Sequence, residues 1–353
     1  MKKKYFIVCF IIFVTLACFI NIKTKSDTQL QRQVSLFFVH SGRLAQRFKF
    51  YPISELNFRV ALYIKPDLAW AWNLIGYNKY LQYEARKNYI TYDKTQKFLS
   101  ESLYHYQKAH EFAPKDRQIM LNIALTHKYL HNIPEAIKWL EKLLERDPEN
   151  TFAYWNLSNI YYEKEDYENA LSYINKYIEL KPEDIDGIFQ KAMIYDSMEK
   201  LEESVLLYEK YLDVNPNSVA ALVNISGVEI QLKEYDKALK HVNNGLLLNP
   251  YSAYLLAYKS EILRKQKKFN EAKAIANRIA NFRGQKYLGY RELAKISYQE
   301  GEKDKAEKYL KDAKKEAQSY LDKYCGGKQY NIDDKSGNCS NRFAFIKYGG
   351  LDD

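Results

Sequence analysis

Glycine and proline are scarce in this sequence, whose 353 residues include only 13 and 8 of them. These two residues mark turns, and a β-sandwich or barrel made of many short strands needs more of them. Tyrosine, in contrast, occurs 32 times, and Lys, Glu, Leu, Ile and Asn are also abundant, which favours helices with large packed side chains. We therefore expect an all-α chain, and of its two possible forms, two globular domains or one elongated repeat array, the composition favours the array.

The sequence patterns of catalytic sites are also missing. There is no Gly-rich phosphate loop and no Gly-x-Ser-x-Gly sequence. His105 and His110 are five residues apart, and His127 and His131 are four apart. The second pair could share one face of a helix, but no acidic signature accompanies it, so we interpret both of its members as surface residues. We expect no enzymatic activity, no metal and no small-molecule cofactor.

Negative charge is scarce only at the start of the chain. Residues 1–60 contain ten Lys and Arg against Asp27 and Glu55, a net charge of +8, which leaves +2 for residues 61–353. In that longer part acids and bases alternate along the sequence, as they do on solvated helix faces. The overall charge of +10 therefore does not indicate a nucleic-acid partner.

The amino terminus combines three lysines with an uncharged run. Lys2, Lys3 and Lys4 precede the segment from Tyr5 to Ile22, whose 18 residues would form about 27 Å of helix, close to the thickness of the bilayer hydrocarbon. We expect residues 1–26 to be a signal-anchor or transmembrane segment that attaches the chain to a membrane. Because the lysines stay inside, the remainder is expected outside the cytoplasm, periplasmic or at the cell surface if the source is bacterial.

Two other fates of this segment remain open. Thr15-Leu16-Ala17 has small residues at a spacing that suits cleavage before Cys18, so Cys18 could carry a lipid, or cleavage could release a secreted protein. The apolar residues after Cys18 favour the uncleaved anchor. Each alternative also places the body of the chain outside the cytoplasm.

Prolines recur with a fixed period. They occupy the equally spaced positions 114, 148, 182, 216 and 250. If each proline is position 32 of a unit, small residues recur at positions 8 and 20. Those small residues are Ala124, Ser158, Ala192 and Ser226 at position 8, and Ala136, Ala170, Ser204 and Ala238 at position 20. Each unit is predicted to be a pair of helices that approach closely at these small residues and end at the proline.

This pattern resembles the tetratricopeptide repeat, most clearly at Trp72-Asn73-Leu74-Ile75-Gly76 and Tyr154-Trp155-Asn156-Leu157-Ser158. The resemblance implies a right-handed superhelical α-solenoid of helical hairpins. Eight repeats are expected over 35–320, after a linker at 27–34. Their ranges are 35–68, 69–116, 117–150, 151–184, 185–218, 219–252, 253–286 and 287–320. The second range is longer than the others, and we place its insertion within 83–96.

The resemblance also implies a concave groove lined by the first helix of each hairpin, at positions near 2, 5, 9 and 12. The candidate partner-binding residues are Asn122, Phe152, Trp155, Asn156, Asn159, Tyr162, Phe189, Gln190 and Asn224. Exposed aromatic residues would anchor a partner, and the amides at position 6 could bond an extended peptide backbone. The alternatives stay open that the aromatic residues pack against neighbouring helices and that Asn is simply common at position 6.

The last segment, residues 321–353, departs from the helical pattern. It contains several glycines, and Arg342-Phe343-Ala344-Phe345-Ile346 alternates like a short strand. Cys325 and Cys339 are the only cysteines outside the apolar segment, and in an exported protein such a pair favours a disulfide. We predict a short, non-helical, disulfide-clipped cap over the last hairpin, with a docking motif as the alternative.

These features together predict a membrane-anchored, extracytoplasmic scaffold or assembly factor that binds a partner protein or peptide in its groove. Two alternatives are a non-catalytic adaptor subunit of an envelope enzyme complex and a structural spacer without a specific ligand. The fold hosts many unrelated interactions, so the partner itself is not specified.

Overall fold

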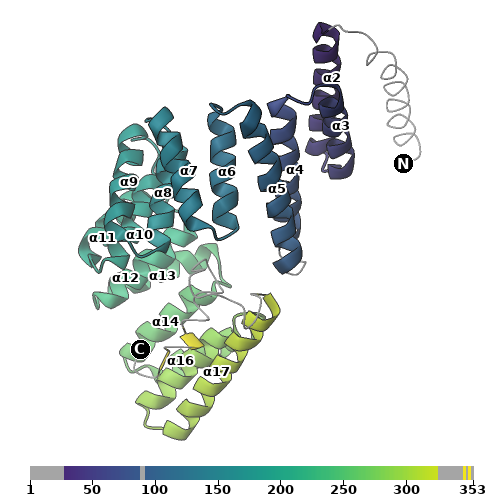
Figure 1. Cartoon of the computed structure of the whole chain (residues 1–353). Helices are drawn as coiled ribbons and strands as arrows, with labels where there is room; N and C mark the ends of the chain where they lie inside the picture. Colours follow the sequence, from purple (N-terminus) through teal and green to yellow (C-terminus); the bar gives the residue numbers. More distant parts are fainter. Residues whose placement is uncertain (1–27, 88–91, 325–344, 347–348, 351–353) are drawn as a thin grey trace. The chain divides into compact units, whose positions relative to one another are not determined.

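The chain folds into a succession of helical hairpins (Figure 1). The computed structural model describes residues 28–87, 92–324, 345–346 and 349–350. Within these ranges there are sixteen α-helices and no strand. The chain divides into two compact units, Met1–Pro148 and Glu149–Asp353, and each is described by itself. In each hairpin, helix A denotes the first helix and helix B the second.

The first unit contains three hairpins. Their helices are α2 (Thr28–Arg47) with α3 (Tyr51–Ile64), α4 (Ala69–Arg86) with α5 (Tyr92–Phe112), and α6 (Arg117–Tyr129) with α7 (Ile133–Arg146). The second unit contains five. Their helices are α8 (Thr151–Glu163) with α9 (Tyr167–Leu180), α10 (Asp186–Ser197) with α11 (Leu201–Val214), α12 (Val219–Gln231) with α13 (Tyr235–Leu248), α14 (Ala253–Lys265) with α15 (Phe269–Ala280), and α16 (Lys286–Gln299) with α17 (Lys303–Tyr324).

Polar side chains start four of the eight A helices, at the spacing of the prolines or a multiple of it. Asp116, Asn150, Ser218 and Ser252 each accept a hydrogen bond from the backbone N–H three residues later, which satisfies an otherwise unpaired donor of the first turn. The equivalent residue, Asp184, accepts a hydrogen bond of 2.5 Å from a tyrosine hydroxyl and one of 3.2 Å from the backbone N–H two residues later. Helix α10 accordingly begins one residue later than the period predicts.

The turn between helices A and B has the same backbone conformation in six successive hairpins. One residue in each has a positive φ, between 58° and 62° for the non-glycine residues and 82° for the glycine. These residues are His131, Glu165, Glu199, Lys233, Lys267 and Gly301. Their even spacing continues the period of the prolines and shows that the same turn geometry closes each hairpin.

The two helices of a hairpin meet at the small residues, as the sequence predicts. Several of these contacts are also hydrogen bonds between a buried serine hydroxyl and a carbonyl oxygen of the partner helix. The bonds join Ser158 to Ala170 at 2.9 Å, Ser204 to Ala192 at 2.9 Å and Ser260 to Ala272 at 3.0 Å. A buried hydroxyl needs such a partner, so these bonds fix the point at which helices A and B cross.

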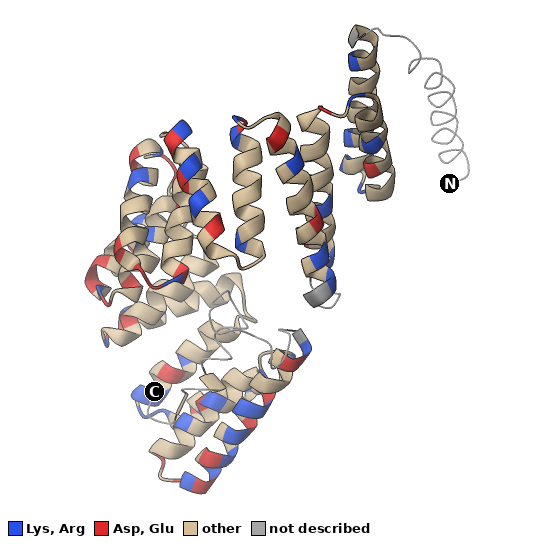
Figure 2. Cartoon of the chain, viewed as in Figure 1, with Lys and Arg blue, Asp and Glu red and all other residues tan. Residues whose placement is uncertain are grey.

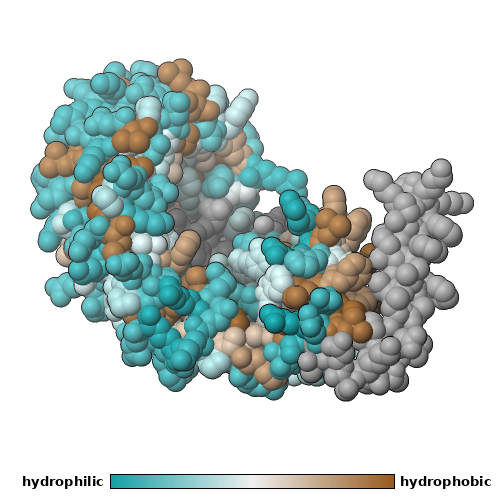
Figure 3. Space-filling view, turned by 90° about the horizontal axis from the view of Figure 1, so that it is seen from above, coloured by the Kyte–Doolittle hydropathy of each residue, from teal (hydrophilic) through white to brown (hydrophobic). Residues whose placement is uncertain are grey.

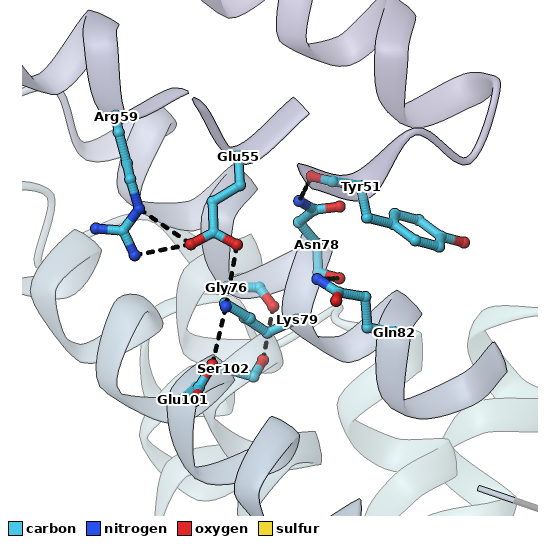
Figure 4. Close-up of polar contacts among 9 residues, drawn as sticks. All are labelled: Tyr51, Glu55, Arg59, Gly76, Asn78, Lys79, Gln82, Glu101 and Ser102. Atoms are coloured by element: carbon cyan, nitrogen blue, oxygen red, sulfur yellow. Dashed lines mark hydrogen bonds and ion pairs between the residues drawn. The ribbon is translucent and has the colours of Figure 1, made fainter. Parts of the chain in front are cut away.

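An ion-pair network joins three helices of the first unit (Figure 4). Lys79 on α4 lies 3.0 Å from Glu55 on α3 and 2.8 Å from Glu101 on α5. Arg59 also contacts Glu55, at 2.7 Å. Burial alone would raise the pKa of Glu55, but the bonds from Arg59 and Lys79 outweigh burial and hold that pKa below its ordinary value. The network therefore contributes to the packing of α3, α4 and α5.

Two boundaries differ from those expected, and the insertion in the second repeat is largely helical. The predicted linker at 27–34 is helical from Thr28 onward, because this segment continues α2. The extra residues near 83–96 lengthen both helices of their hairpin, so that α4 has 18 residues and α5 has 21. Helix α17 continues to Tyr324, past the predicted end of the last repeat at 320, because Leu321 still contributes to the core and is buried.

Two predicted features lie on residues outside the described ranges. They are the membrane segment at 1–26 and the disulfide between Cys325 and Cys339. In the predicted cap beyond Tyr324, the described residues are Phe345, Ile346, Gly349 and Gly350. Phe345 and Ile346 are helical rather than extended, and the Gly349 amide donates a hydrogen bond of 2.9 Å to the Phe345 carbonyl. The strand predicted here is therefore wrong for these two residues, because a local hydrogen bond closes a helical turn.

Candidate partner-binding surface

The A helices α8 and α10 are joined side by side through polar groups. Gln190 on α10 is buried, and its side-chain nitrogen donates to the hydroxyl of Ser158 and to the amide oxygen of Asn159, both at 3.0 Å. Tyr162 on α8 shares a hydrogen bond of 3.0 Å with Ser197 on α10. The side-chain oxygen of Gln190 has no partner within the described structure. These bonds hold the faces of two successive A helices in a fixed arrangement.

The other predicted amides use their N–H groups within the chain. Asn156 donates to the Phe152 carbonyl at 2.7 Å, and Asn159 donates to the Trp155 carbonyl at 3.0 Å. Asn224 donates to the hydroxyl of a tyrosine on α11 at 3.2 Å. The amide residues thus lie on the A helices as expected, but each has a donor engaged in an intramolecular bond.

Two of the predicted aromatic residues pack against their own hairpins. The ring of Trp155 lies 5.0 Å from that of Tyr177 on α9, and the ring of Phe189 lies 4.9 Å from that of Tyr211 on α11. Trp155 and Phe189 occupy position 5 of successive repeats, and both tyrosines occupy position 27. The two rings therefore make the same contact, which supports the alternative that position 5 joins helix A to helix B.

Phe152 is different, because its side chain is 62% exposed at position 2 of α8. The ammonium group of Lys181 lies 5.5 Å from the centre of its ring, a distance at which a cation is attracted to an aromatic face. Phe152 shares one helical face with Trp155, Asn159 and Tyr162. It is the predicted aromatic residue that is most available to a partner.

Asn122 lies in the first unit, and the other eight predicted residues lie in the second. Asn122 on α6 donates to the amide oxygen of Asn73 on α4 at 2.9 Å and accepts from Gln118 at 2.9 Å. Beside this chain of amides, the hydroxyl of Tyr80 on α4 donates to that of Tyr129 on α6 at 3.4 Å. Amide and aromatic groups therefore join successive A helices in this unit as well.

A cluster of charged residues on α14 and α16 was not anticipated. It contains three cations and two carboxylates, namely Arg264, Arg291, Lys295, Glu261 and Glu292. Glu292 is 1% exposed and Arg264 is 5% exposed. Burial raises the pKa of Glu292 and lowers the pKa of Lys295, since each charged form loses its hydration.

The sequence does contain a signal for this cluster. Position 6 carries an amide in four successive repeats, from Asn122 to Asn224, but a glutamate in the last, at Glu292. The alternation of acids and bases suggested solvated helix faces, and this was wrong for Glu292, Arg264 and Glu229, all of which are buried. Glu229 is instead paired with His241 at 2.8 Å.

The histidine pairs do not form a metal site in the described part of the chain, where no group of three or more potential ligands occurs. His131 is an exposed turn residue, as expected. His127 is buried rather than at the surface, as is its neighbour Thr126 on α6. Burial lowers the pKa of His127 and of His105, so both are held in the neutral form.

Comparisons with known proteins agree with this geometry. Residues 121–185 and 185–218 match family models of the tetratricopeptide repeat, so this part of the chain consists of such repeats. A tetratricopeptide repeat protein from Parabacteroides merdae is similar in structure, with a TM-score of 0.55 and 15% identity, over 70% of this chain and 92% of that one. PilF of Pseudomonas aeruginosa has a TM-score of 0.49 and 17% identity, over 61% and 91% of the two chains.

The likeness to these structures concerns the fold alone. A search of curated proteins found no match. The fold is all-α and built of tetratricopeptide-like hairpins, a class of repeat that generally acts as a scaffold for protein–protein interaction rather than as a catalyst. Among the described helices, none is both long enough and apolar enough to cross a membrane.

Proposed function

We propose that the chain is an extracytoplasmic, membrane-anchored scaffold that holds a peptide segment or helix of a partner protein against its A helices. The observation that carries this proposal is the exposed ring of Phe152 on the same face of α8 as Asn159, whose amide oxygen accepts a hydrogen bond from Gln190 on α10. Most exposed residues on the face seen in Figure 3 are hydrophilic, and the hydrophobic ones lie in separate patches. A large aromatic side chain exposed beside ordered polar groups is typical of a binding hot spot.

The polar groups near Phe152 can contribute orientation as well as affinity. The unpartnered oxygen of Gln190 can accept a hydrogen bond from a peptide N–H if the neighbouring side chains shift. Because Asn159 and Ser158 fix the Gln190 side chain, little conformational entropy would be lost when the partner binds. In such a complex the Phe152 ring would bury apolar surface of the partner, and the Gln190 amide would orient the peptide backbone.

The test compares two variants whose mutated side chains are equally exposed. Phe152→Ala removes the ring on helix A, and Leu206→Ala removes a side chain on helix B that is 65% exposed. Partners are recovered from solubilised membranes with residues 27–353 as bait, and the affinity of the recovered partner is then measured. Phe152→Ala should weaken binding about tenfold or more, as loss of an aromatic anchor does, and Leu206→Ala should leave it unchanged.

Stability must be measured on the same samples. Both substitutions should leave the melting temperature nearly unchanged, since neither side chain is buried. In contrast, Trp155→Ala should lower it, because that ring packs on Tyr177. Full partner recovery by Phe152→Ala would remove this patch from the site. Recovery of no specific partner would favour a structural spacer. Recovery of a partner with its own catalytic domain would favour a non-catalytic adaptor subunit of an enzyme complex.

The anchored, exported location rests on the sequence. Lys2, Lys3 and Lys4 before an 18-residue uncharged run support insertion with the body of the chain outside the cytoplasm. Attachment through lipid at Cys18 and secretion after cleavage are the alternatives. A disulfide between Cys325 and Cys339 is part of the same proposal, because it requires an oxidising compartment.

A further inference from the structure

The described part of the tail places one aromatic side chain in the core of the last two hairpins. Phe345 is 8% exposed and its ring lies 5.9 Å from that of Tyr287 on α16. It belongs to a buried cluster with residues of four helices. Those residues are Ala253, Leu256 and Ala257 on α14, Ile279 on α15, Tyr287 and Leu288 on α16, and Ala313 and Ala317 on α17. We call these eight residues the Phe345 seat.

The seat uses the repeat positions at which a partner is expected. Ala257 occupies position 5 of its repeat and Leu288 occupies position 2 of the next. In α8 these two positions hold Trp155 and Phe152. The cluster of the tail residue Phe345 therefore includes Leu288, which holds the position that the proposed function assigns to a partner through Phe152.

Half of the seat consists of alanines, on α14 and α17. Position 5 carries Trp155, Phe189 and Val223 in three successive repeats and then Ala257. Trp155 and Phe189 reach the helix B of their own hairpin, whereas Ala257 is too short to do so and is buried in the same cluster as Phe345. The ring of Phe345 thus joins these alanines from the tail, outside the two hairpins.

The tail residue at position 349 is adapted to this arrangement. The Gly349 amide closes a helical turn on the Phe345 carbonyl at 2.9 Å. A Cβ atom at residue 349 would overlap the Phe345 ring and this carbonyl oxygen. A side chain at residue 349 would therefore displace Phe345, so this position requires glycine.

We propose that the Phe345 seat is a second peptide-binding site, filled in the free protein by the chain's own tail, and that a partner segment with a phenylalanine anchor displaces Phe345. The proposal rests on the proposed function in that both assign partner binding to position 2 of a helix A. A phenylalanine side chain forms no conventional hydrogen bond, so packing alone seats it. An equivalent ring from another chain can supply the same packing, and the tail then acts as a built-in competitor.

The chain supplies its own probe for the test. A fluorescent peptide of residues 340–350 is titrated into the full-length solubilised protein and into its Phe345→Ala variant. The variant has an open seat and should bind the peptide at least tenfold more tightly than the unmodified protein, whose tail competes. The same peptide with Phe345 replaced by Ala should bind the variant at least tenfold more weakly.

A filled seat provides the matched control. Ala257→Phe in the Phe345→Ala background restores an aromatic ring from α14 itself, so this double variant should recover the melting temperature and lose peptide binding. If folded Phe345→Ala binds no peptide saturably, or binds it no better than the unmodified protein, the proposal is overturned. Adding Phe152→Ala should leave peptide binding at the seat unchanged, which separates a failure here from a failure at Phe152.

Discussion

At the scale of single residues, the positive-φ position in the turn between helices A and B shows the effect of backbone conformation on stability without a change in packing. Lys233 adopts a φ of 62° and is exposed, whereas Gly301 holds the equivalent place two repeats later, with a φ of 82°. The left-handed backbone conformation is unfavourable for a residue with a Cβ atom but not for glycine. Lys233→Gly should therefore raise the free energy of unfolding by about 0.5–1 kcal/mol, measured by urea denaturation.

Gly301 provides the reverse experiment. No heavy atom lies within 4 Å of the place where its Cβ would be, so Gly301→Ala changes conformation without a clash. It should lower the free energy of unfolding by about 1 kcal/mol. A stabilising effect of Gly301→Ala would show that the turn does not need a left-handed residue.

A buried histidine makes the stability of the first unit depend on pH. His105 is 6% exposed, stacks on Trp72 at 5.6 Å, and burial lowers its pKa to about 4, with the positive charge of Arg59 acting in the same direction. The unfolded chain binds this proton near pH 6.5 and the folded chain only near pH 4. The contribution is therefore complete above pH 6.5 and is lost as the pH falls from 6.5 to 4.

His105→Phe keeps an aromatic ring and removes the proton site. The fall in unfolding free energy between pH 6.5 and 4 should become smaller by up to about 3 kcal/mol, measured from urea transitions followed by tryptophan fluorescence. His110 and His127 also have lowered pKa values and remain in both proteins. Only the difference between the two pH profiles belongs to His105, and identical profiles would contradict the assignment.

At the scale of the elements, helix pairs depend on close backbone approach. Gly289 on α16 faces α15, and a Cβ there would overlap the backbone nitrogen of Ala280 and lie 2.7 Å from the Ala276 carbonyl oxygen. Backbone cannot move aside as a side chain can. Gly289→Ala should therefore lower the free energy of unfolding by about 1–3 kcal/mol, despite the higher helix propensity of alanine.

Gly227 on α12 is a suitable control for this substitution. A Cβ there would lie 2.8 Å from the hydroxyl of Tyr258, the end of a side chain rather than backbone. Gly227→Ala should cost clearly less than Gly289→Ala, because the ring can rotate and alanine favours the helix. Equal effects in thermal unfolding would show that helix propensity, not the α15–α16 contact, determines both.

At the scale of the whole molecule, charge is distributed unevenly along the chain. Acidic and basic residues are interleaved on most of the described helices (Figure 2), and the excess of positive charge lies in residues 1–60. Because lysines before an apolar segment stay in the cytoplasm, a C-terminal alkaline phosphatase fusion should be active in cells. An inactive phosphatase fusion with a fluorescent cytoplasmic reporter fusion would reject the exported orientation.

The candidate site was predictable in part. Helical spacing places Phe152, Trp155 and Tyr162 on one face of α8, and a single sequence suffices for that. Helical spacing does not predict which of the three side chains is exposed to a partner, because exposure depends on the neighbouring helices. Tyr177 and Ser197 come from other helices and engage two of the three side chains, which leaves Phe152 as the exposed one.

The sequence by itself determined the helical hairpins, because proline and small residues recur with one fixed period and act through local rules. A proline ends a helix, and a small residue permits a close crossing, whatever lies farther away. The tertiary structure alone decided that Gln190 bonds two residues of α8 and that Phe345 is buried in one cluster with Ala257. These contacts join residues far apart in the sequence, and no local pattern records which distant side chain fills a given space.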